Sequence, residues 1–149
     1  MALMENTITL SPEFAIAGQI TTDQLQTAKD AGYQAVLNLR VPGEQGFLED
    51  EESKAQAVGL RYVNIPVSPN EISQVADQVI GQLEELPKPV LVHCGSALRA
   101  GVMVLAYLGT REGKNAETVL DEARKAGFTA LDSKPPMKQF VEEYIANHR

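Results

Sequence analysis

Short apolar runs alternate with longer amphipathic stretches along this chain, and the alternation limits the folds that it can adopt. The runs are rich in valine, isoleucine and leucine, and glycine, proline or asparagine lies near most of their ends. Runs of this kind predict buried strands, and the stretches between them predict helices. The predicted strands are 7–10, 14–16, 35–39, 62–65 and 90–92. The predicted helices are 21–31, 48–58, 68–86, 100–108, 116–126 and 136–146.

This order predicts an α/β fold with three layers. We expect a central, mainly parallel sheet of about four to five strands, flanked by helices. With 149 residues, of which 44% are hydrophobic, the chain is expected to form a single domain over residues 1–149. Right-handed crossovers place the carboxyl ends of the strands at one edge, where loops 40–47, 66–71 and 94–99 are expected to meet.

Charge and cysteine content exclude several classes of protein. The net charge of −7 argues against broad binding to nucleic acid or to an anionic membrane. A single cysteine excludes an intrachain disulfide and fits a reducing compartment. Residues 1–10 lack the basic and apolar regions of a signal peptide, and no apolar run is long enough to span a bilayer. The sequence therefore predicts a cytoplasmic protein, and it leaves the oligomeric state open.

The single cysteine, Cys94, follows the apolar strand 90–92 and precedes a loop of small residues, Arg99 and an apolar helix. Backbone amides, a helix N-terminus and a guanidinium all favour a thiolate at such a position. The same groups bind a tetrahedral oxyanion. The candidate binding residues are Gly95, Ser96, Ala97, Leu98 and Arg99. The alternative is that Cys94 is a small buried hydrophobe and Arg99 a surface residue.

The His-Cys and Arg of this segment resemble the signature of cysteine-dependent tyrosine and dual-specificity phosphatases. Cys94 and Arg99 enclose four residues, however, one fewer than in that signature. The closer resemblance is to the phosphatase-like domain of the bacterial beta-lactamase hydrolase-like proteins, which has the shorter spacing. Segments 14–21, 32–40 together with Gly43-Glu44, and 59–67 are also similar to that domain.

The resemblance implies a dual-specificity-phosphatase-like fold, with Cys94 as nucleophile and Arg99 as phosphate ligand. It implies hydrolysis of phosphate monoesters through a phosphocysteine, on a phosphorylated protein or a small phosphate ester. Three residues depart from the family pattern. Ala97 replaces a glycine, so a left-handed backbone there would be strained. Ala100 replaces a hydroxyl residue, which predicts slow hydrolysis of the phosphocysteine by water. Gly95 replaces a basic residue, which weakens the positive electrostatic field around Cys94.

Hydrolysis of a phosphate ester also needs a general acid that protonates the leaving oxygen, and no motif in the sequence identifies this residue. Glu71, in the loop after strand 62–65, is the best candidate, although Ser68 and Glu71 also have the spacing of a capping box. Glu44 and Asp50 are alternatives in the other rim loop. Arg40, just beyond a buried strand, either adds positive charge to the pocket or forms an ordinary surface salt bridge.

Other residues bear on the chemistry less directly. His93 is expected to hydrogen-bond the loop backbone and tune the thiolate rather than to act as a base. No group of cysteine, histidine and carboxylate residues has metal-ligand spacing, so we expect no metal and no cofactor. The four-residue spacing between Cys94 and Arg99 also occurs in rhodanese-like sulfurtransferases, which leaves persulfide chemistry as an alternative. A domain that binds phosphorylated ligands without turnover is a further alternative.

Overall fold

The computed structural model describes Met4 and residues 6–148, which form a five-stranded, mostly parallel sheet. Its order is β1-β2-β5-β3-β4, and only the edge pair β1–β2 is antiparallel among the described strands. The strands are β1 (Thr7–Ser11), β2 (Phe14–Ala17), β3 (Ala35–Asn38), β4 (Arg61–Asn64) and β5 (Val90–His93). The predicted α/β fold with a mainly parallel sheet is confirmed.

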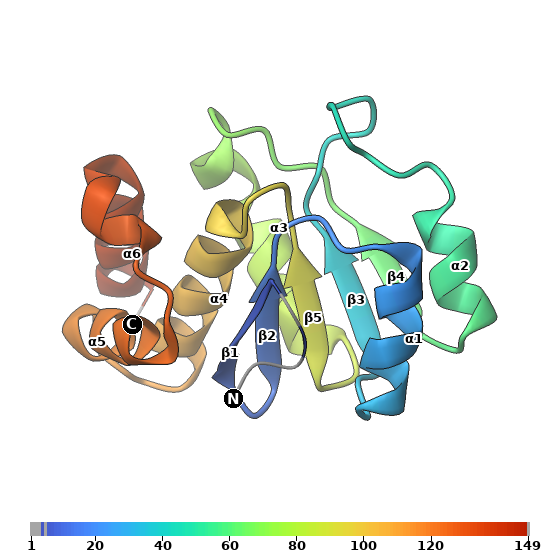
Figure 1. Cartoon of the computed structure of the whole chain (residues 1–149). Coiled ribbons are helices and arrows are strands. Elements are labelled where there is room, and N and C mark those ends of the chain that lie inside the picture. Colours follow the sequence, from blue (N-terminus) through green and yellow to red (C-terminus); the bar gives the residue numbers. More distant parts are fainter. Residues whose placement is uncertain (1–3, 5, 149) are drawn as a thin grey trace.

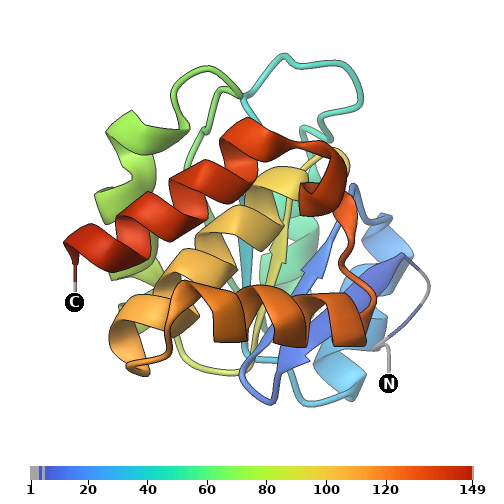
Figure 2. The same cartoon turned by 90° about the vertical axis from the view of Figure 1, so that its left-hand side faces the viewer.

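Helices cover both faces of the sheet (Figure 1). They are α1 (Thr22–Asp30), α2 (Glu51–Ala57), α3 (Ile72–Glu85), α4 (Leu98–Arg111), α5 (Ala116–Ala126) and α6 (Pro135–Asn147), with a 3₁₀ turn at Ala130–Ser133. Helices α1 and α2 lie on one face, and α4, α5 and α6 lie on the other, where Figure 2 shows them in front of the strands. The chain moves outward from β2 to β4 through α1 and α2 and then returns to β5 through α3. Because parallel crossovers are right-handed, this reversal places α3 on the opposite face.

Alternating strand residues enter two separate cores. Phe14 and Ile16 of β2 pack with α3 to α6, whereas Ala15 and Ala17 pack with α1 and α2. The same alternation divides β5, where Leu91 faces α1 and α2 while its two valines face the larger core. Both faces of the strands are therefore apolar, which is why the runs in the sequence are nearly continuous.

Two helices begin later than predicted. Helix α2 begins at Glu51 rather than at residue 48, after a loop in which Gly43 and Gly46 have positive φ angles of 92° and 90°. Helix α3 begins at Ile72 rather than at residue 68. The predicted capping box at Ser68 is wrong, because Glu71 is itself the N-cap residue and its backbone N–H closes a turn onto the Ser68 carbonyl. Pro69 at the second position of this turn favours that geometry.

Strand β5 occupies the centre of the sheet, between β2 and β3, and ends at the edge where the three predicted loops meet. This is the position at which open α/β sheets bind ligands, because the crossovers to either side diverge there. In the part of the chain that the structure describes, no helix is both long enough and apolar enough to cross a membrane.

Candidate active site

The loop from β5 to α4 folds closely around the end of the sheet. The Cys94 amide donates to the carbonyl of Ala17 (3.1 Å), and the Gln19 amide donates to the carbonyl of Gly95 (3.3 Å). A Cβ atom at Gly18 would lie 2.9 Å from that same Gly95 oxygen. Glycine at position 18 therefore allows the end of β2 to pass directly against the loop.

The turn into α4 uses a residue in the left-handed conformation. Ala97 is the N-cap residue of α4, with φ 74° and ψ −10°. The backbone here is thus the left-handed one that would be strained at an alanine, because L-residues other than glycine adopt it at a cost of about 1–2 kcal/mol. An alanine N-cap has no side-chain acceptor, so it leaves the first amides of α4 to other acceptors.

The thiol of Cys94 lies against this helix N-terminus. Its Sγ atom accepts a hydrogen bond from the Ala100 amide at 3.5 Å, and the residue is fully buried. Interaction with Cys94 also contributes to a raised pKa of Arg99, behind the larger effect of the hydrogen bond to Glu44. The thiol is thus next to a helix N-terminus and a guanidinium, two groups that favour a thiolate.

Arg99 is held by residues from two other loops. Its Nη1 donates to Glu44 Oε1 (3.1 Å) and to the Val67 carbonyl (2.8 Å), and its Nη2 donates to Glu44 Oε2 (2.9 Å). These contacts use only part of the N–H donors of the guanidinium. The three loops predicted to meet at this edge, 40–47, 66–71 and 94–99, therefore meet at Arg99.

Arg40 reaches the same carboxylate from the end of β3. Its Nε donates to Glu44 Oε2 at 2.8 Å, its Nη2 donates to the Gln45 carbonyl, and it is only 6% exposed. A Cβ atom at Gly95 would lie 3.4 Å from Arg99 Nη2 and 3.8 Å from Arg40 Nη2. Two guanidinium groups therefore converge beside the loop, so Arg40 is a buried partner of the site and not the surface salt bridge that was the alternative.

Glu44 is ionised in this arrangement. The hydrogen bond from Arg99, together with those from Val41 and Arg40, lowers the pKa of Glu44 to about 2 despite partial burial. A carboxylate with so low a pKa does not donate a proton at neutral pH. The arrangement suits Glu44 to holding the two arginines and argues against its role as general acid.

A second polar cluster lies behind the loop, and sequence reasoning missed its central residue. Glu51 stands in a run of four acidic residues, 49–52, yet it is 1% exposed and hydrogen-bonded to His93. The Nδ1 atom of His93 lies 3.5 Å from the Cys94 carbonyl, which agrees with the expected contact to the loop backbone. Spacing in the sequence could not distinguish Glu51 from its exposed neighbours Glu49 and Glu52.

The remaining predicted residues lie around the rim. Ser96 and Gly95 are exposed, and Leu98 is half-buried in the first turn of α4. Glu71 is exposed at the start of α3, on the segment that continues from the Val67 carbonyl bound by Arg99.

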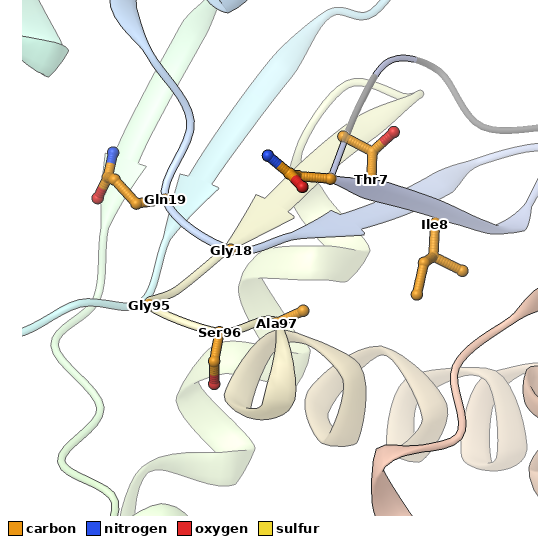
Figure 3. Close-up of a pocket in the computed structure, with 8 residues that line it drawn as sticks. Thr7, Ile8, Gly18, Gln19, Gly95, Ser96 and Ala97 are labelled. Carbon is orange, nitrogen blue, oxygen red and sulfur yellow. The ribbon is translucent and has the colours of Figure 1, made fainter.

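A depression of about 430 Å³ lies beside the loop, between the loop and β1. Figure 3 shows Gly18 and Gly95 next to each other where β2 and β5 end, with Thr7 and Ile8 across the depression.

Comparison with known proteins identifies the family. A model of the phosphatase-like domain of beta-lactamase hydrolase-like proteins matches residues 6–109. The chain belongs to this family. Beta-lactamase hydrolase-like proteins of Xylella fastidiosa are 32% identical over 111 residues, which is 72% of this chain and 26% of the relative. One from Agrobacterium fabrum is 30% identical over 106 residues, 68% of this chain and 24% of the relative. The chain thus spans about a quarter of the length of these relatives.

Solved structures show the same fold at low sequence identity. A DUF442 protein of Shewanella putrefaciens superimposes with a TM-score of 0.77 at 22% identity, covering 96% of this chain and 93% of that chain. PTPMT1, solved in complex with PI(5)P, gives a TM-score of 0.74 at 13% identity and covers 96% of each chain. TpbA of P. aeruginosa, solved in complex with pTyr, gives 0.61 at 17% identity, covering 95% and 91%. The phosphatase-like domain therefore has the fold of cysteine-dependent phosphatases.

Proposed function

We propose that this domain hydrolyses phosphate monoesters, with Cys94 as the nucleophile. The observation that carries the proposal is the buried Cys94 Sγ, which lies 3.5 Å from the first-turn amide of Ala100 and interacts with Arg99. A helix N-terminus and a guanidinium that favour a thiolate also bind the oxygens of a phosphoryl group. The substrate is a phosphorylated protein or a small phosphate ester.

In the first step, the Cys94 thiolate attacks phosphorus and the ester P–O bond breaks. The three non-bridging oxygens accept hydrogen bonds from the loop amides and from the Arg99 guanidinium. Glu44 and the Val67 carbonyl fix the plane of that guanidinium through the contacts described above. The result is a phosphocysteine and a leaving oxygen that requires a proton.

We assign that proton to Glu71. Glu44 is unsuitable because its pKa is lowered to about 2 by the hydrogen bond from Arg99. Glu71 is exposed and lies four residues after Val67, whose carbonyl contacts Arg99, so the support for this assignment is its place on a loop that meets the site. A positioned acid of this kind typically contributes about 10²–10⁴-fold to the rate.

In the second step, water attacks the phosphocysteine, the S–P bond breaks, and the sulfur departs as a thiolate with release of inorganic phosphate. The position that carries a hydroxyl in the related phosphatases is Ala100, which offers only its amide to the sulfur. Stabilisation of the leaving thiolate is therefore weaker, and the phosphocysteine is expected to accumulate.

Intact-mass analysis after mixing with an aryl phosphate tests the proposal. The wild-type protein should gain the mass of one phosphoryl group and should hydrolyse p-nitrophenyl phosphate, whereas the Cys94→Ser variant should do neither. Equal rates for the two proteins would refute the phosphatase assignment. Incubation with thiosulfate, followed by cyanide, tests the sulfurtransferase alternative. A protein that gains the mass of one sulfur atom from thiosulfate and then releases thiocyanate with cyanide would be a sulfurtransferase and not a phosphatase.

A further inference from the structure

The buried carboxylate of Glu51 is not explained by phosphate binding. Its two oxygens accept hydrogen bonds from His93 Nε2 (2.5 Å), Gln19 Nε2 (2.8 Å) and the Tyr62 hydroxyl (2.9 Å). Burial would raise the pKa of Glu51, but the hydrogen bonds from His93, Gln19 and Tyr62 lower it overall. Burying a charged group costs free energy unless partners of this kind compensate the loss of hydration. A carboxylate that is 1% exposed therefore suggests a role beyond the surface.

His93 connects this carboxylate to the nucleophile. It is the last residue of β5, its side chain is fully buried, and it directly precedes Cys94. Its Nε2 faces Glu51, and its Nδ1 lies 3.5 Å from the Cys94 carbonyl oxygen. Both ring nitrogens thus face oxygen acceptors, and only the protonated imidazolium can donate from both at once.

Gln19 connects the same carboxylate to the rim of the site. Its Nε2 donates to Glu51, and its Oε1 accepts from Arg40 Nη1 at 2.7 Å. A negative Glu51 and a positive Arg40 therefore fix the orientation of the Gln19 amide. A continuous set of hydrogen bonds passes from His93 through Glu51, Gln19 and Arg40 to the Glu44 that holds Arg99.

We infer that Glu51 is a positioning residue that holds His93 as an imidazolium, and that this positive charge behind the loop stabilises the Cys94 thiolate. The inference rests on the proposed role of Cys94 as nucleophile. The titratable and charged groups in the hydrogen-bond network that begins at His93 are Glu51 on α2, Tyr62 on β4, Arg40 and Glu44 after β3, and Arg99 on α4. Of these, Glu51 is the group that forms an ion pair with the imidazolium, at 2.5 Å.

The test uses the fact that Cys94 is the only cysteine of the chain. Ultraviolet absorbance of the thiolate, measured against pH, then reports on Cys94 alone and requires no substrate. In Glu51→Gln, the midpoint of this titration should move upward by about one pH unit, which is about a tenfold loss of thiolate below the midpoint. Glu49→Gln, an exposed carboxylate two residues away, is the matched control and should leave the titration unchanged.

A Glu51→Gln protein with native circular dichroism and the wild-type thiolate titration would overturn the inference and leave Glu51 with a structural role only. If this variant does not fold, nitrogen-15 NMR of His148→Gln decides the question, because His93 is then the only histidine. Imidazolium signals at pH 7 support the inference, and a neutral ring at that pH overturns it. Because neither readout needs turnover, an inactive protein with the predicted titration would refute the phosphatase proposal alone.

Discussion

The phosphate side of the site and its leaving-group side are built differently. On the phosphate side, Arg99 is bound by Glu44 and by the Val67 carbonyl, and Arg40 is buried against the same carboxylate. On the leaving-group side, the candidate acid Glu71 is exposed at the start of α3. The proposed oxyanion-binding groups are therefore held by buried contacts within the protein, whereas the proposed acid is exposed and no side-chain capping hydrogen bond within the described residues holds it.

The largest expected effect is on the phosphate side. In Arg99→Lys the positive charge remains, but the planar guanidinium that binds Glu44, and that we propose binds phosphate, is lost. We expect kcat/KM for p-nitrophenyl phosphate to fall about 10²–10³-fold, as for removal of an oxyanion donor. Arg61→Lys, at an exposed arginine of β4, is the control. Unchanged affinity of Arg99→Lys for inorganic phosphate would show that the Cys94–Arg99 loop is not the anion-binding site.

The leaving-group side is tested by Glu71→Gln. An acid matters most for a poor leaving group, so we expect a loss of about 10²-fold with an alkyl phosphate and a small effect with p-nitrophenyl phosphate. The measurement compares kcat/KM for the two esters in both proteins. Glu85→Gln, at an exposed position near the end of the same helix, should match the wild type. Equal losses with both esters would assign Glu71 to loop structure rather than to proton transfer.

Removing the carboxylate that joins the two arginines should cost stability. In Glu44→Gln, two guanidinium groups lose their shared anion, and we expect unfolding at pH 7 to become easier by about 1–3 kcal/mol. Folding lowers the pKa of Glu44 from 4.5 to about 2, mainly through the hydrogen bond from Arg99. The ionised carboxylate therefore stabilises the fold above about pH 4.5, and this contribution disappears as the pH falls toward 2.

Denaturation curves of Glu44→Gln and wild type should accordingly converge as the pH is lowered over that interval, while Glu49→Gln stays close to the wild type throughout. A difference that persists at pH 2 would mean that the packing of the side chain, and not its charge, stabilises the loop.

The smallest expected effect concerns Ala97, in the turn that leads from β5 into α4. Ala97 has a φ of 74°, which glycine adopts without strain. Ala97→Gly should therefore stabilise the folded protein by about 0.5–1 kcal/mol, since relief of strain exceeds the added entropy of the unfolded chain. Ala126→Gly, in the last turn of α5, should destabilise it instead. A destabilised Ala97→Gly would show that the methyl group contributes packing that outweighs the strain.

Local sequence patterns predicted most of the fold because its buried strands are nearly continuous apolar runs and its helices are amphipathic. The apolar run of β5 and the small-residue loop after it were sufficient to place Cys94 at the end of a buried strand. The start of α3 was misplaced because Ser68 and Glu71 fit a capping box, whereas Pro69 favours a turn before the helix.

The sequence by itself determined the order of strands and helices and the placement of one thiol next to a helix N-terminus. These features depend on neighbours within a few residues. Only the tertiary structure decided that Glu44 binds Arg99, across 55 positions, and that Glu51 lies buried against His93, across 42. Such pairs depend on the order β2-β5-β3 and on which crossover covers which face, and no local pattern distinguishes a carboxylate that will be buried from one that will face water.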